Sequence, residues 1–160
     1  MDAAHDVRSK RMTTSLVKKI GKLLRPMHYE KFDLVFRRSG PIAFDVIQIS
    51  LAQYSSGITV AFGVYFKGIG QDTNPVESIC HIKSGLSGVV GPCDFTAIAE
   101  DYVDTEEASA GIVAAVRLIA IPWLDSVKTH NGLTKEAERN AEGVSTHLRD
   151  ALQYGTLTLR

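Results

Sequence analysis

The stretch DVIQISLAQYSSGITVAFGVYF, from Asp45 to Phe66, constrains the fold of this chain more than any other. Apolar residues alternate with small or polar ones on both sides of YSSG, which is typical of two antiparallel strands joined by a turn. On one face of this hairpin the side chains are large and apolar, namely Ile47, Ile49, Leu51, Ile58, Val60, Phe62, Val64 and Phe66. Such a face is stable only when other elements cover it, so we expect helices on that side.

Helical periodicity precedes and follows this hairpin. An amphipathic helix is predicted from Thr13 to about Pro26, because apolar residues recur there at spacings of three and four. A second and mostly apolar helix is predicted to begin at Asp104 and to be kinked or ended by Pro122. The motif THNGLT is expected to form a turn, after which Thr134 opens the last helix.

Two more strands are predicted, one from Phe32 to Arg38 and one around Ser78–Lys83. The order of helix, consecutive strands and then helices indicates an α+β fold, with an antiparallel meander sheet of about four strands and helices packed on one face. A length of 160 residues suits a single domain. We expect residues 1–12 to form a flexible leader and residues 13–160 to form one α+β domain.

The charges balance overall but are unevenly distributed along the chain. Ten basic and four acidic residues give residues 1–40 a net charge of +6, whereas residues 41–127, with three and ten, carry −7. The longest apolar run, from Ala108 to Leu124, contains Arg117 and Pro122, and two cysteines are too few for a disulfide framework. These features favour a reduced, cytoplasmic protein without a membrane partner.

No local motif indicates chemistry. Cys80, His81, Cys93 and Asp94 are of metal-ligating types, but their spacing fits no zinc pattern. The five histidines form no recognisable catalytic motif and are interpreted as surface or core residues. We therefore expect no metal, no cofactor and no enzymatic activity, although a catalytic site built from distant residues would leave no local trace.

Two groups of residues are candidates for recognition. An acidic segment either complements the start of a helix or forms a docking surface for a basic protein, and it contains Glu100, Asp101, Asp104, Glu106 and Glu107. The polar face of the predicted sheet either meets water or lines a ligand site, and its candidates are Arg37, Gln48, Ser50, Thr59 and Tyr65.

A third, basic group lies at the start of the chain, with Lys18, Lys19, Lys22, Arg25, Lys31, Arg37 and Arg38. These cations either face water or contact phosphates. Aromatic residues are not interleaved with them in the manner of single-strand-binding proteins, and no helix-turn-helix is visible, so a nucleic-acid partner is not favoured.

The segment from about Leu16 to Tyr65 resembles a mainly bacterial family of uncharacterised proteins, domain of unknown function 4304. The resemblance rests on LLRPMHYEKF, on VFRR with Arg37 and Arg38, on IQIS and on ITVAFGVYF, with CHIKSGLSG and IPWL extending it to about residue 125. His28-Tyr29 stands where a Gly-Phe pair is common in the family. The resemblance implies a fold and a bacterial setting but no activity.

Taken together, the sequence favours a non-enzymatic protein-binding module, such as an immunity protein that neutralises a basic bacterial toxin. The alternative is a small-molecule-binding domain or minor enzyme with its pocket on the polar sheet face. The sequence does not determine the oligomeric state.

Overall fold

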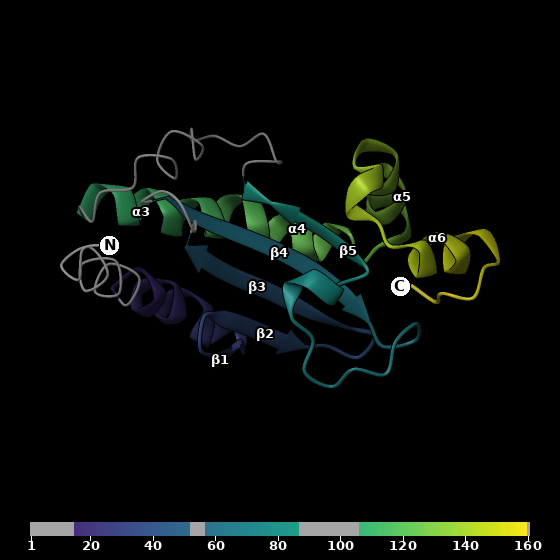
Figure 1. Ribbon diagram of the computed structural model, residues 1–160, viewed down its shortest axis with the longest axis horizontal. Coiled ribbons are helices and arrows are strands. Elements are labelled where there is room, and N and C mark those ends of the chain that lie inside the picture. The colour runs from purple at the N-terminus through teal and green to yellow at the C-terminus, as the bar shows by residue number, and fades with distance from the viewer. Residues whose placement is uncertain (1–14, 52–56, 87–105, 160) are drawn as a thin grey trace, which may run out of the picture.

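The computed structural model describes residues 15–51, 57–86 and 106–159, and it confirms the α+β fold. Five antiparallel strands form one sheet in the order β1-β2-β3-β4-β5, so every strand pairs with its neighbour in sequence (Figure 1). The strands are β1 (Glu30–Phe32), β2 (Val35–Ser39), β3 (Ala43–Leu51), β4 (Ile58–Phe66) and β5 (Ile82–Gly85). The predicted leader and most of the YSSG turn lie outside the described residues.

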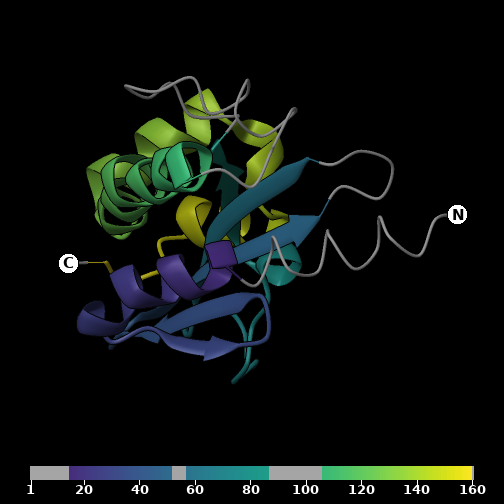
Figure 2. The ribbon, with the colours of Figure 1, turned by 90° about the vertical axis from the view of Figure 1, so that its left-hand side faces the viewer.

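The alternation in the central hairpin places side chains as predicted. In the β3–β4 register, Ile47 lies opposite Phe62 and Ile49 opposite Val60, and all four are at most 1% exposed. They belong to one core cluster that also takes in side chains of the N-terminal helix and the central helix. Figure 2 shows these two helices, in purple and green, on the same side of the strands.

The N-terminal helix follows its predicted apolar stripe. Residues 15–24 are helical, and Leu16, Ile20 and Leu24 are completely buried. A 3₁₀ turn, η1 (Arg25–Met27), contains Pro26 and ends at His28, whose φ of 64° is left-handed. That conformation favours glycine, so His28 holds a backbone that few residues with a side chain adopt.

Pro122 was predicted to kink or end the central helix, and the helix does not end at this residue. It runs without a break through α3 (Glu106–Ala115), a π-helical segment (Val116–Ala120) and α4 (Ile121–Ser126). A proline N has no hydrogen to donate and its ring crowds the preceding turn. The wider π turn just before Pro122, in which Ile121 N–H donates to Val116 O, accommodates the ring. The helix therefore does not end there.

The first predicted strand, Phe32 to Arg38, is two strands. Asp33 and Leu34 form a two-residue turn between β1 and β2, and the φ of Asp33 is 55°. Asp tolerates this left-handed backbone better than most residues do, so the chain reverses where the sequence showed only alternation. The last predicted strand begins later than expected, at Ile82, after a 3₁₀ turn, η2 (Glu77–Ile79).

The last predicted helix is also two helices. The motif THNGLT starts α5 (His130–Arg139) rather than a turn, because Thr129 Oγ1 caps that helix by accepting a hydrogen bond from Gly132 N. After a 3₁₀ turn, η5 (Ala141–Gly143), α6 (Thr146–Gln153) follows. Between them Val144 bridges to Ile82 and covers the outer edge of β5.

One helix in the described part of the chain, Glu106–Ser126, is long and apolar enough to cross a membrane by length and composition alone. Half of its apolar window is buried inside the protein, as the core helix of a globular domain would be.

Candidate functional site

The face of the sheet opposite the helices is covered over its middle by residues of the β4–β5 connection. Val46 and Tyr65 are 0% and 5% exposed and form a second, small apolar cluster with Cys80. Gly63 allows this close approach, because a Cβ there would lie 2.6 Å from Cys80 Cβ. This part of the predicted polar face is therefore not open to water.

Three of the predicted sheet-face residues hold this connection in place. Arg37 Nε donates a hydrogen bond to Pro75 O at 2.6 Å, and Gln48 Oε1 accepts one from Glu77 N at 3.3 Å. The Tyr65 hydroxyl accepts one from Asp72 N at 2.8 Å. These polar groups therefore recognise the protein's own backbone.

The other two sheet-face residues lie on the same face of the sheet, beyond Gln48. Ser50 and Thr59 lie opposite each other in the β3–β4 register, four residues along β3 from Val46, and Thr59 is exposed. A ligand site that includes these two residues remains a prediction, whereas Arg37, Gln48 and Tyr65 are already engaged.

His81 is a core histidine on the same side. Its Nδ1 accepts a hydrogen bond from Phe66 N at 2.9 Å, and its ring stacks on Tyr65 with the centroids 4.4 Å apart. Burial, and to a lesser extent the electrostatic effect of the nearby His147, lowers the pKa of His81 to about 4. The ring is therefore neutral at neutral pH and carries its proton on Nε2.

Phe32 forms an exposed aromatic contact with Arg37 at the free edge of the sheet. The Phe32 side chain, on β1, is 48% exposed, and the Arg37 guanidinium lies over its ring at 4.8 Å. Because Pro75 O also fixes Arg37, the cation and the ring are held in a defined arrangement. This pair was not among the sequence predictions, since it depends on the turn at Asp33.

Two of the five predicted acidic residues lie within the described part of the chain. Glu106 and Glu107 open α3 and are both exposed, and Glu106 Oε2 accepts a hydrogen bond from Lys19 Nζ at 2.7 Å. Glu100, Asp101 and Asp104 lie outside the described residues. The contact at Lys19 joins the start of the central helix to the N-terminal helix.

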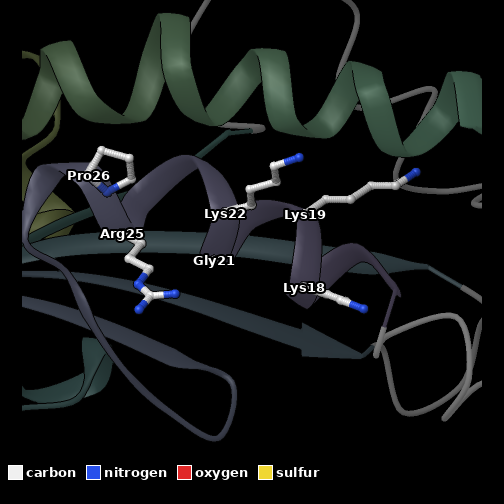
Figure 3. Close-up of a pocket in the computed structure, with 6 residues that line it drawn as sticks. All are labelled: Lys18, Lys19, Gly21, Lys22, Arg25 and Pro26. Atoms are coloured by element: carbon white, nitrogen blue, oxygen red, sulfur yellow. The ribbon is translucent and has the colours of Figure 1, made fainter.

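A groove of about 460 Å³ lies beside this contact on the N-terminal helix. Figure 3 shows its lining residues, which are Lys18, Lys19, Gly21, Lys22, Arg25 and Pro26. In that view Lys19 and Lys22 extend toward the central helix, and Lys18 and Arg25 extend to the other side. Positive charge thus borders the groove on both sides.

A buried charged cluster under the sheet was missed by the sequence analysis. Asp45 is 2% exposed, and its Oδ2 accepts hydrogen bonds at 2.8 Å from both Arg38 Nε and Lys128 Nζ. Asp125 Oδ1 accepts from the same two cations, so two positive and two negative charges balance. The signal was present, because Asp45 shares the alternation of Ile47 and Ile49 and so had to point into the core.

This cluster reaches the ring of Tyr29. The Arg38 guanidinium lies over that ring at 4.9 Å. Burial and the nearby Asp45 charge raise the pKa of the Tyr29 hydroxyl, so the phenol stays protonated. The arrangement pins the end of α4 to β2 and β3, and we interpret it as structural.

The described residues contain no group of three or more metal-ligating side chains. Cys80 is buried, and burial first and the charge of Glu77 second raise the pKa of its thiol. A thiol in this state is a weak nucleophile. No family model, curated protein or solved structure matches this chain.

Proposed function

We propose that this chain is a non-enzymatic module that binds another protein through the Phe32–Arg37 pair. Aromatic and arginine side chains dominate the binding energy of protein interfaces. Phe32 offers about half of its surface to a partner, and Arg37 is already fixed by the ring and by Pro75 O. Little side-chain freedom is therefore left to lose on binding, which favours affinity.

The charge of the start of α3 supports a basic partner. Glu106 and Glu107 are exposed there, and three more acidic residues, Glu100, Asp101 and Asp104, precede them in the sequence. Complementary charge speeds association between proteins. A basic bacterial toxin, met in the cytoplasm, has this chemistry, and the proposal that the chain neutralises one rests further on the family resemblance.

The first experiment tests the Phe32–Arg37 pair. The full chain, tagged, is used to capture partners from its host, and each captured protein is identified, purified and titrated. Phe32→Ala should weaken the affinity at least about tenfold. Tyr154→Ala is the matched control, since Tyr154 is 71% exposed but lies on the C-terminal side of α6, and it should change little. Equal affinity of Phe32→Ala and the wild type would contradict the proposal.

The second experiment tests the charge of the partner. The triple change of Asp101, Asp104 and Glu107 to Lys should slow association several-fold while dissociation changes little. The control changes three exposed acidic residues of the C-terminal region, Glu138, Glu142 and Asp150, to Lys. Equal slowing by both variants would show that only net charge matters. The toxin proposal is tested with the protein encoded beside this gene. That protein should stop growth of the host when it is expressed alone, and co-expression of this chain should restore growth.

A further inference from the structure

Gly21 lies inside the N-terminal helix at a position where the described structure does not require a glycine. Glycine is one of the least favourable residues in a helix interior. Residue 21 is helical, and a Cβ there would lie 3.5 Å from Phe36 Cε1, an ordinary van der Waals distance. A side chain would therefore stabilise this helix without a clash. Positions that break the local rule of their element are expected to be functional or strained, and this one is not strained.

The missing side chain leaves space for a ligand. Gly21 lines the groove of about 460 Å³ on the N-terminal helix, a volume in the range of sites that bind small organic groups. The surface of the groove is mostly carbon, from the ring of Pro26 and from the aliphatic stems of the lysine and arginine side chains. The floor of the groove therefore suits an apolar group.

The charged ends of these side chains point away from the groove in opposite directions. In Figure 3 Lys22 extends toward the central helix, whereas Lys18 and Arg25 extend to the other side. Within the part of the chain that the structure describes, these three cations make no ion pair and no side-chain hydrogen bond. An apolar floor thus lies between two flanks of unpaired positive charge.

We propose that this groove binds an acidic segment of a partner protein, with one large apolar side chain of that segment inserted beside Gly21. The inserted side chain removes apolar area of the groove from water. Carboxylates on either side of it pair with Lys22 on one flank and with Lys18 and Arg25 on the other. Each flank has its own cation, so the charges do not have to converge on a single anion.

Two other negatively charged partners fit this surface less well. A helix that binds an anionic membrane inserts its apolar face, but Leu16, Ile20 and Leu24 of this helix are completely buried in the core. Proteins that bind single-stranded nucleic acid stack its bases on aromatic side chains, and no aromatic residue is among the described residues that line the groove.

The first test compares the calorimetric titration of the full chain with three peptides. The first peptide has one phenylalanine between two pairs of acidic residues, the second has serine in place of the phenylalanine, and the third has glutamine in place of each acidic residue. The first should bind at one saturable site, and the other two should bind at least about tenfold more weakly. Equal binding of the first two peptides, or no saturable binding of the first, would overturn the proposal.

The second test fills the groove. Gly21→Leu places a side chain in the space that the phenylalanine would occupy, so binding of the first peptide should weaken at least about tenfold. Leucine is a better helix former than glycine, so the variant should unfold at the same temperature as the wild type or at a higher one. The matched control is Gly68→Leu, because Gly68 is exposed and nothing lies within 4 Å of a Cβ there. Unchanged binding in Gly21→Leu, or equal weakening in Gly68→Leu, would overturn the proposal.

The third test separates the two flanks of the groove. Lys22→Gln removes the cation on the side of the central helix, and Lys18→Gln/Arg25→Gln removes the two on the other side. Each variant should weaken binding of the phenylalanine peptide several-fold, because each loses charge-assisted hydrogen bonds. Lys31→Gln, at an exposed site on β1, should bind within about twofold of the wild type. Equal weakening in Lys31→Gln would show that only net charge attracts the peptide, which would overturn the site.

The last test distinguishes the class of partner. Vesicles of phosphatidylserine and phosphatidylcholine, and a single-stranded oligonucleotide with the charge of the peptide, should both bind more weakly than the phenylalanine peptide. Tighter binding of either one would overturn the assignment to a protein segment. Phe32→Ala should bind the peptide as the wild type does, since the groove is separate from the Phe32–Arg37 pair and takes a partner of opposite charge. The two proposals can therefore fail independently.

Discussion

On the face of the sheet that meets the helices, Ile47, Phe62 and Val64 are completely buried among other apolar side chains. On the opposite face Val46 and Tyr65 are buried by one connection, which is held by hydrogen bonds and by close contact at Gly63. The first face is stabilised by its buried apolar area and by side-chain packing, which tolerate small shifts of the side chains. The second depends on the geometry of a few polar atoms, so single-atom changes should matter there.

The largest effect is expected on the helix-covered face. Phe62→Ala should lower the free energy of unfolding by about 4 kcal/mol, because the ring is fully buried and packs edge-to-face on Trp123 at 5.0 Å. Denaturant unfolding followed by the fluorescence of the single tryptophan measures this. Phe32→Ala, at a half-exposed phenylalanine, should cost less than about 1 kcal/mol. Similar losses of unfolding free energy in Phe62→Ala and Phe32→Ala would contradict this expected difference.

The next effect is a pH dependence on the connection-covered side. The pKa of His81 is lowered to about 4 in the folded protein, against about 6.5 for an unfolded chain. As the pH falls from about 6.5 to about 4, the unfolded chain takes up a proton that the folded chain refuses. Stability is therefore full above pH 6.5 and declines below it, by about 2 kcal/mol at pH 4.5.

The measurement for His81 is the free energy of unfolding at pH 7 and at pH 4.5. His81→Asn keeps an acceptor for Phe66 N–H but does not titrate, so its loss between the two pH values should be smaller by most of that amount. His130→Asn, at an exposed histidine, should follow the wild type. An unchanged pH dependence in His81→Asn would show that protonation of His81 does not cause the loss of stability at low pH.

An effect of comparable size is expected from one methyl group at Gly63. The new Cβ would lie 2.6 Å from Cys80 Cβ and 2.8 Å from Ile82 O, so Gly63→Ala should cost about 2 kcal/mol. It should also speed thiol labelling of Cys80, measured with Cys93→Ser as background. Gly68→Ala is the control, because nothing lies within 4 Å of its new Cβ. Equal labelling rates in both would show that the connection does not depend on this contact.

The smallest effect concerns a single hydroxyl. Tyr65→Phe removes the acceptor of Asp72 N–H and should cost about 1 kcal/mol, while the ring still stacks on His81. Hydrogen exchange of the Asp72 amide should become faster, whereas Tyr154→Phe, at an exposed tyrosine, should leave it unchanged. No change at Asp72 would mean that water replaces the hydroxyl without loss.

Prediction from sequence succeeded where periodicity alone decides the outcome. The apolar faces of the N-terminal helix and of β3 and β4 are as expected. Prediction failed where a single residue decides where the chain reverses or where a helix begins. Asp33 turns back a strand that looked continuous, and Thr129 begins a helix where a turn was expected. At Pro122, where a kink or an end was predicted, the π segment carries the helix on, so the predicted end is wrong.

The candidate sites divide in the same way. Arg37, Gln48 and Tyr65 were recognised as a polar row on one face, but their ligand is the backbone of residues 72–77. No local pattern indicates that a distant connection will return to that row. The Asp45 cluster likewise joins β3 to Asp125 and Lys128, which are about eighty residues away in the chain.

The sequence by itself determined which residues are buried in the central strands and helices, because alternation and helical spacing are properties of neighbouring residues. Only the tertiary structure decided that the second face of the sheet is covered and that Phe32 and Arg37 meet. It also decided that Lys19 pairs with the distant Glu106. Those outcomes depend on contacts between segments far apart in the chain, whose geometry is set by turns, glycines and caps rather than by periodicity.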